Sequence, residues 1–358
     1  MATIDLRSDT VTRPTPAMRQ AMCEAEVGDD ERDGDPTTRR LEARTAELLG
    51  KEGALFFPSG VMANQAAVWL HTRPGSEILL DADAHIIHWE AAGAAALSGV
   101  QVRPVPPSGA VMSAADLRGA LRPASRFAPA ATLVCVENTH NGAGGKVTPL
   151  AELRAIAEVA REAGIPVHMD GARLWNAAVA SGASLAELAA CADTVMVAFS
   201  KGLGGPVGAA VAGSAASIDA LWTIRKRLGG ALRQSGIVAA GALHGLEHHL
   251  GRLVVDHENA ATFARGVDGV GGARVVAPET NIVMIDLPAG VASSDVVARA
   301  ATAGVLLTVW TPTRVRAVTH LDVSADDAAQ AAAVVAGVLR ELAPAGLAVA
   351  VEREAVAR

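Results

Sequence analysis

Short apolar runs alternate with segments of helical pattern between residues 50 and 210, and this alternation constrains the fold more than any other feature. Apolar runs of strand length occur at residues 54–57, 77–81, 131–136, 166–170 and 193–197. Fully apolar strands separated by helices are typical of parallel sheets that helices cover on both faces. We therefore expect an α/β fold, with a mostly parallel central sheet flanked by helices.

The pattern changes near residue 265, where shorter strands and helices follow one another. A chain of 358 residues is long enough for two domains. We expect an N-terminal arm over residues 1–20, a large domain over 21–250 and a small C-terminal α+β domain over 251–358. Within the large domain, Thr37 is expected to cap a helix over residues 39–49.

Composition excludes several classes of protein. The net charge of −7 does not suggest a nucleic-acid partner, and the apolar runs are too short to span a membrane. Three cysteines without short spacings argue against a disulfide framework or a zinc site. No signal peptide is predicted from the charged N-terminus, so we expect a cytoplasmic protein. The chain has no tyrosine, so no phenol can serve as an acid or a base.

Lys201 lies shortly after the last of the apolar runs, which ends at residue 197. Three glycines and a proline lie within the next five residues, which predicts a loop in which the backbone can approach a ligand closely. A lysine at such a place can be an ordinary solvated charge. It can also form a Schiff base with pyridoxal phosphate (PLP), which requires a partner for the ring nitrogen and a seat for the phosphate.

Both partners have candidates at the ends of predicted strands. Asp170 ends one strand, and α/β sheets place their ligands at the carboxyl ends of strands. Ser59, Gly60 and Val61 open a helix, whose free N–H groups and positive dipole end suit a phosphate. A plain strand-to-helix turn would also explain these three residues.

Further candidate residues lie elsewhere in the chain. His85 could stack on a cofactor ring and move protons; a metal pair with His88, three residues later, lacks further ligands. Ser8 lies in a polar segment that could grip a carboxylate or simply fray. Arg233 belongs to a basic cluster that could be a solvated face or could donate a phosphate ligand across a subunit boundary.

Seven segments, in order from the N-terminus to about residue 340, together resemble the low-specificity L-threonine aldolases. They are DLRSDTVT at 5–12, VGDD at 27–30, ENTHN at 137–141, DGAR at 170–173, SKGL at 200–203, RQSG at 233–236 and VTHLDVS at 318–324. These aldolases are fold-type I PLP enzymes related to the β-eliminating lyases. The resemblance implies cleavage of L-threonine, L-allo-threonine and related β-hydroxy-α-amino acids to glycine and an aldehyde.

The resemblance also implies roles for individual residues. Lys201 holds the cofactor, Asp170 binds the pyridine nitrogen, and Arg173 contacts the ring oxygen and the substrate. His85 stacks on the ring and also faces the substrate. The remaining cofactor-binding residues are Ser59, Gly60, Val61, Ser200 and Arg233, with Arg233 arriving from a neighbouring subunit. Ser8 and Arg316 hold the substrate carboxylate, and no metal is implied.

Three positions depart from the family's pattern. Val61 replaces a common threonine, Arg32 replaces a common tyrosine, and Phe127 stands where a histidine often faces the substrate hydroxyl. With these groups missing, His85 is the candidate general base, alongside Lys201 and Asp170 as catalytic residues. The departures keep open a β-eliminating lyase, or an aldolase for a bulkier β-hydroxy amino acid. A non-catalytic PLP protein is disfavoured because the lysine, aspartate and arginines are present.

The expected partner is a small-molecule amino acid, with no nucleic acid and no membrane. A phosphate ligand from a neighbour predicts a homodimer or homotetramer with shared active sites. The resemblance further implies a place in threonine catabolism and glycine biosynthesis.

Overall fold

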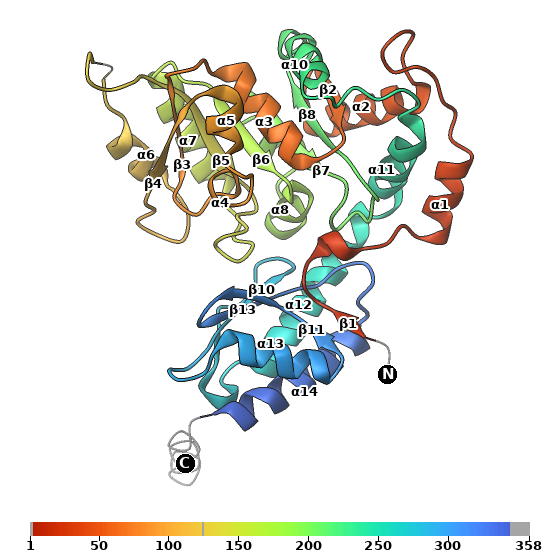
Figure 1. Cartoon of the computed structure of the whole chain (residues 1–358), viewed down its shortest axis with the longest axis vertical. Coiled ribbons are helices and arrows are strands. Elements are labelled where there is room, and N and C mark those ends of the chain that lie inside the picture. Colours follow the sequence, from red (N-terminus) through yellow and green to blue (C-terminus); the bar gives the residue numbers. More distant parts are fainter. Residues whose placement is uncertain (1–2, 124, 344–358) are drawn as a thin grey trace. The chain divides into compact units, whose positions relative to one another are not determined.

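The computed structural model describes residues 3–123 and 125–343, which divide into two compact units. One unit consists of residues 13–251, and the other combines residues 3–12 with residues 252–343. Strand β1 (Ile4–Asp5) pairs in parallel with β11 (Val305–Leu306), and Figure 1 draws this red strand among the blue elements. The first residues are therefore part of the second unit, whereas the sequence suggested a separate arm over residues 1–20.

The larger unit contains a sheet with the strand order β2-β8-β7-β6-β5-β3-β4. All of its neighbouring strands are parallel except β8, which is antiparallel to both β2 and β7. Helices flank this sheet (Figure 1), which confirms the predicted α/β fold. The strands are β2 (Gly53–Phe57), β3 (Glu77–Asp81), β4 (Gln101–Val105), β5 (Ala131–Glu137), β6 (Val167–Gly171), β7 (Thr194–Ala198) and β8 (Ala209–Gly213).

Helix α3 packs on strands β2, β7 and β8, where Leu55, Phe57, Met196 and Val211 contribute to a shared apolar core. Helix α10 packs beside α3 on the same core. The helices of this unit are α1 (Pro16–Cys23), α2 (Pro36–Leu49), α3 (Gly60–His71), α4 (His85–His88), α5 (Gly93–Ser98), α6 (Ala114–Ala120), α7 (Leu150–Glu162), α8 (Leu174–Ser181), α9 (Leu185–Ala189), α10 (Ala215–Arg227) and α11 (Gly236–His248).

The start of α2 differs from the prediction. Asp35, not Thr37, caps the helix, because its Oδ1 accepts the N–H of Thr38 at 2.9 Å. Pro36 occupies the first helical position, where its missing N–H costs nothing. Thr37 lies inside the helix, and its hydroxyl donates to the carbonyl of Glu26.

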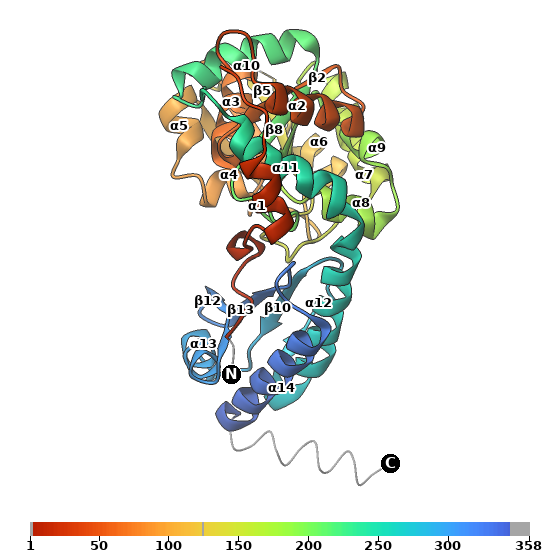
Figure 2. The same cartoon turned by 90° about the vertical axis from the view of Figure 1, so that its right-hand side faces the viewer.

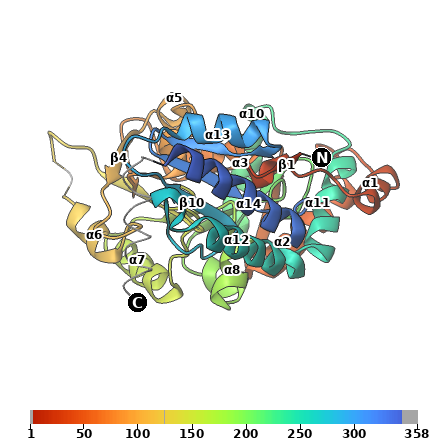
Figure 3. The same ribbon diagram turned by 90° about the horizontal axis from the view of Figure 1, so that it is seen from below.

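The smaller unit contains an antiparallel sheet with the order β12-β13-β10-β9. Helices α12 and α14 lie side by side (Figure 2), and Figure 3 shows α13 next to α14 from below. Val283, Ile285, Val315 and Ala317 belong to the core beneath them. The elements are α12 (Leu253–Val267), β9 (Arg274–Val275), β10 (Ile282–Asp286), α13 (Ser293–Thr302), β12 (Thr308–Thr311), β13 (Arg314–Val318) and α14 (Ala325–Leu342), with 3-10 turns at Asp9–Val11, Leu250–Arg252 and Val270–Gly272.

Two properties of the described residues bear on the expectations from composition. No helix among them is both long enough and apolar enough to cross a bilayer. Cys23, Cys135 and Cys191 all carry free thiols.

Candidate active site

The carboxyl ends of the parallel strands bring the predicted cofactor residues to one edge of the larger sheet. Asp170 on β6 lies opposite Met196 on β7, and Lys201 follows β7 by three residues. Strand β2 runs parallel to β7, with β8 between them, and leads into Ser59. Ligands of α/β sheets bind outside this edge. The topology therefore places Asp170, Lys201 and Ser59 where a common ligand could reach them.

Asp170 is a buried carboxylate with two hydrogen-bond donors already in place. Its Oδ1 accepts the N–H of Ala172 at 3.0 Å, and its Oδ2 accepts the side-chain amide of Asn64 at 2.8 Å. These donors orient the carboxylate. A carboxylate held in this way is suited to accept a charge-assisted bond from a protonated ring nitrogen.

His85 begins α4 and lies beside this carboxylate. Its ring Nδ1 is 2.9 Å from Glu90 Oε1, and its backbone N–H donates to Glu137 Oε2 at 2.7 Å. Burial lowers the pKa of His85, but the hydrogen bond that the ring makes to Glu90 and the charge of Asp170 outweigh burial, so the net pKa is raised. The positive charge of Lys201 also acts on this ring, in the opposite direction.

The loop that carries Lys201 is held by its own backbone. The N–H of Gly205 donates to Phe199 O at 2.9 Å, and the N–H of Gly204 donates to Lys201 O at 2.8 Å. A Cβ at Gly205 would lie 2.7 Å from Phe199 O, so a larger residue does not fit there. This close approach explains part of the glycine-rich sequence after Lys201. The side chains of Ser200 and Lys201 remain partly exposed.

The first turn of α3 offers backbone donors. Ser59 caps the helix, with its Oγ accepting the N–H of Met62 at 3.2 Å. The N–H groups of Gly60 and Val61 have no acceptor within the helix, and they lie at its positive end. Asn64, one turn further, bonds Asp170. The donors for a phosphate and the acceptor for a ring nitrogen thus adjoin one helix.

Two buried polar atoms next to Asp170 make no hydrogen bond among the described residues. Asn138 Nδ2 and Thr139 Oγ1, directly after β5, are buried without a hydrogen-bond partner among the described residues. The backbone N–H of Asn138 donates to Asp170 O at 3.0 Å, so these atoms adjoin the site. Unsatisfied buried groups are expected where a polar ligand binds. Together with the α3 amides, Asp170 and the Lys201 amine, they fit PLP.

The two predicted arginines of this unit differ in their surroundings. Arg173 is buried at the start of α8, with its Nη1 3.3 Å from Asn141 Oδ1. Arg233 is more than half exposed and pairs with Glu31 at 2.7 Å and Asp29 at 3.4 Å in the same chain. Its role at a neighbour's phosphate stays a prediction.

Ser8 and Arg316 lie together in the smaller unit, although more than 300 residues separate them in the sequence. Arg316 Nη2 donates to the carbonyl of Arg7, the residue before Ser8, at 3.3 Å. The guanidinium also lies 4.7 Å from the centre of the Trp310 ring, a cation–π contact. The N–H of Val318, which ends β13, donates to the carbonyl of Leu6 at 2.8 Å, so the N-terminal residues lie beside the strand that carries Arg316.

The positions that depart from the family's pattern lie on the surface. The side chain of Arg32 is 79% exposed, and Phe127 is 90% exposed with the Arg126 guanidinium near its ring. Val61 is exposed as well. Within the chain itself, none of these three side chains is buried in the fold.

Asn64 was not singled out from the sequence, yet it connects the site's two buried carboxylates. Its amide nitrogen donates to Asp170 Oδ2 and to Glu90 Oε1, each at 2.8 Å. One side-chain amide carries two such hydrogens, so both are used. The amide oxygen of Asn64 must then accept a hydrogen bond.

His168 supplies that bond and continues a chain of hydrogen bonds behind Asp170. His168 Nε2 is 3.1 Å from Asn64 Oδ1 and therefore carries the proton, while Nδ1 accepts from Thr194 Oγ1 at 2.9 Å. His71 Nε2 lies 3.0 Å from the same hydroxyl. Burial lowers the pKa of His168 to about 4, so its ring is neutral, as these hydrogen bonds require. Its spacing of two from Asp170 on β6 was the available signal, since such residues share a strand face.

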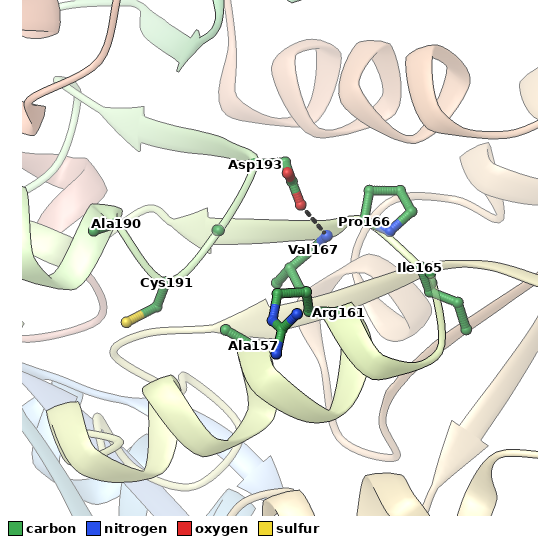
Figure 4. Close-up of a pocket in the computed structure, with 10 residues that line it drawn as sticks. Ala157, Arg161, Ile165, Pro166, Val167, Ala190, Cys191 and Asp193 are labelled. Carbon is green, nitrogen blue, oxygen red and sulfur yellow. Dashed lines mark hydrogen bonds between the residues drawn. The ribbon is translucent and has the colours of Figure 1, made fainter.

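A surface groove of about 400 Å³ lies at the other edge of the sheet (Figure 4). It is lined by Val167, which begins β6, and by Cys191 and Asp193, which precede β7. Asp193 Oδ2 accepts the N–H of Val167 there at 2.7 Å. Because these are the amino ends of the strands, the groove is separate from the candidate active site.

Similar proteins are known from both sequence and structure comparisons. A low-specificity L-threonine aldolase from Arabidopsis thaliana is 40% identical over 335 residues, covering 91% of this chain and 94% of the relative. A low specificity L-threonine aldolase from Escherichia coli K12 is 39% identical over 331 residues, covering 92% of this chain and 97% of the relative. A solved threonine aldolase from Leishmania major superimposes with a TM-score of 0.78 at 21% identity, covering 94% of this chain and 99% of that one; this likeness concerns the fold alone.

The family model described as "Beta-eliminating lyase" matches residues 5–289, which include every residue of the larger unit named above. This match spans well over half of the chain. The protein belongs to the β-eliminating lyase family.

Proposed function

We propose that this protein is a PLP-dependent aldolase that cleaves L-threonine, L-allo-threonine and related β-hydroxy-α-amino acids to glycine and an aldehyde. One observation supports the proposal most directly: the buried Asp170, on β6, and the partly exposed Lys201, three residues after β7, both lie at the carboxyl edge of the sheet. The relatives named threonine aldolases, at about 40% identity over nearly the whole chain, support this substrate class.

The cofactor supplies the electron sink: when bound, PLP stabilises the negative charge that develops on the substrate α-carbon as the Cα–Cβ bond breaks. Lys201 would hold the cofactor through its amine, and the α3 amides of Gly60 and Val61 would receive its phosphate. Asp170 would accept a hydrogen bond from the ring nitrogen and so favour its protonated form; a hydrogen bond to a charged group is worth roughly 1.5–3 kcal/mol.

His85 is the proposed base for the β-hydroxyl proton. Its Nδ1 is engaged by Glu90, so Nε2 is the nitrogen that can take this proton. Ser8 and Arg316 are proposed to hold the substrate carboxylate, because a guanidinium matches a carboxylate with two parallel bonds. The contact between Arg316 and the carbonyl of Arg7 supports a shared role for this pair.

We further propose a homodimer or homotetramer in which Arg233 reaches the phosphate bound by a partner subunit. The Arg233 side chain is 57% exposed, which supports this arrangement, because the guanidinium could leave its present partners Glu31 and Asp29 for a phosphate. We place the enzyme in the cytoplasm, in threonine breakdown and glycine formation; the free thiols of its cysteines support a reducing compartment.

The test is a steady-state comparison of L-threonine, L-allo-threonine and phenylserine with detection of glycine. We expect glycine and one equivalent of the matching aldehyde from each cleaved substrate, and no product from Lys201→Ala. Release of ammonia and a 2-oxo acid without glycine would instead identify a β-eliminating lyase. Cleavage of phenylserine alone would indicate an aldolase for bulkier substrates.

A further inference from the structure

We propose that Glu90 is a positioning residue, which holds the proton of the His85 imidazole on Nδ1 and so reserves Nε2 for proton exchange with the substrate. The catalytic consequence rests on the proposed aldolase function. The protonation of the His85 ring does not, and it can be measured without substrate.

Three side chains converge on the Glu90 carboxylate. His85 Nδ1 lies 2.9 Å from Oε1, Asn64 Nδ2 donates to the same oxygen at 2.8 Å, and Gln65 Nε2 donates to Oε2 at 2.6 Å. The Glu90 side chain has no exposed surface, while that of His85 keeps 29% of its own. An ionised carboxylate only accepts hydrogen bonds. Nδ1 must therefore carry a hydrogen, and the exposed part of the ring is available to a ligand.

The backbone around Glu90 is built for this inward orientation. Ala91 and Ala92, directly after it, have φ values of 52° and 57°, in the left-handed region that non-glycine residues seldom adopt. A Cβ at Gly93 would lie 2.7 Å from Gln65 Cδ, so the glycine makes room for the amide that binds Glu90. Strained positions of this kind cluster at functional sites. Here the turn directs Glu90 toward α3 and His85.

The charges that face His85 favour its protonated form. Glu90 and Asp170 stabilise the imidazolium, and Lys201 opposes them. Glu137 binds the backbone N–H of His85, and burial raises the pKa of that carboxyl. Because the carboxylate of Glu90 both bonds the ring and carries a negative charge, its removal should lower the pKa of His85.

This arrangement defines the proton step. The substrate β-hydroxyl gives its proton to His85 Nε2, and the electron pair of the broken O–H bond becomes the second bond of the aldehyde carbonyl. The pair of the broken Cα–Cβ bond stays with the α-carbon, which is protonated afterwards to give glycine. The imidazolium formed on His85 is stabilised by Glu90, as in other carboxylate–histidine pairs.

The experiment compares wild type with Glu90→Gln, which removes the charge but keeps the size of the side chain. The imidazole of His85 is titrated by NMR in the holoprotein without substrate, with ¹³C-labelled histidine and His85→Asn to assign its signal. We expect Glu90→Gln to shift this titration to lower pH by about one unit or more. The acid limb of kcat/KM for L-threonine should move with it. Glu90→Asp keeps the charge and should restore part of the shift.

Two controls separate positioning from a structural effect. Glu42→Gln removes another largely buried carboxylate, which binds the Phe56 N–H, and should leave the His85 titration in place. In a His85→Asn background, Glu90→Gln should cost less than about threefold in kcat, because its effect passes through His85.

An unmoved His85 titration in folded Glu90→Gln would overturn the inference, as would an equal loss of kcat with and without His85. A shifted titration in a protein that makes no glycine would instead leave the Glu90–His85 pair standing and refute the aldolase function. The titration thus tests the Glu90–His85 pair, and glycine formation tests the aldolase function.

Discussion

The neutral state of His168 predicts how folding stability depends on pH. Burial lowers the pKa of this ring to about 4 in the folded protein, from an ordinary value of 6.5. Between these two pH values, His168 is therefore protonated in the unfolded protein and neutral in the folded protein. The stability from this site is fully present above pH 6.5 and is lost as the pH falls through 4.

The size of the effect follows from the shift. A difference of 2.5 pH units between the two pKa values corresponds to about 3.4 kcal/mol when the loss is complete. At pH 5 the loss is about 2 kcal/mol. In His168→Gln, the amide can still donate to Asn64 Oδ1 and accept from Thr194, but it no longer titrates.

The assay is urea unfolding followed by tryptophan fluorescence at pH 8.0, 6.5 and 5.0. We expect the free energy of unfolding of His168→Gln to fall by about 2 kcal/mol less than that of wild type between pH 8 and pH 5. His88→Asn changes an exposed histidine outside this set of hydrogen bonds and serves as the control. A His168→Gln variant that keeps the full wild-type pH dependence would refute the buried, neutral His168 and the hydrogen-bond order behind Asp170.

Three further variants test other parts of the account. Burial raises the pKa of Glu42 to about 7, so its contribution to stability is present below pH 4.5 and lost as the pH rises through 7. Between pH 5 and pH 9, the free energy of unfolding of Glu42→Gln should therefore rise by about 2.5 kcal/mol relative to that of wild type in the same urea assay. An unchanged difference between the two proteins would contradict the burial of Glu42. Inactive Lys201→Ala and weakened Arg233→Ala should recover activity when unfolded and refolded together, because mixed dimers contain one intact site; no recovery would mean that Arg233 does not act in the partner. His85→Asn should keep PLP, measured by its absorbance after gel filtration, while glycine formation falls at least about a hundredfold, the lower end of the range for loss of a general base; unchanged turnover would exclude His85 as the base.

The features that could be predicted from the sequence depend on neighbouring residues. The strand ending at Asp170 and the loop after Lys201 each have a local signature, and strand–helix alternation fixes which edge of the sheet they share. The α/β fold and the family follow from these signatures and were confirmed.

The features that could not be predicted depend on contacts between distant segments. Asn64 bonds Asp170, which lies 106 residues away in the sequence. His168 can bond Asn64 only because α3 covers β6 and β7. Amide and imidazole side chains have several possible partners, so the sequence alone does not select among them. The pairing of β1 with β11 likewise depends on tertiary contacts between distant segments.

The predicted N-terminal cap of α2, Thr37, was wrong for a different reason. Asp35 and Thr37 are both good capping residues, and both precede the apolar positions of the helix. Pro36 decides between them, because proline is favoured at the first helical position. This signal is local and can be read from the sequence.

The amine that binds the cofactor can be identified by trapping it covalently. The chain contains four lysines, at positions 51, 146, 201 and 226, so the possible attachment points are few. Borohydride reduction of the PLP-loaded protein, followed by peptide mass spectrometry, fixes the cofactor to the amine that holds it. The account predicts a pyridoxyl group on the peptide that contains Lys201. A pyridoxyl group on Lys51, Lys146 or Lys226, or on none of the four, would contradict it.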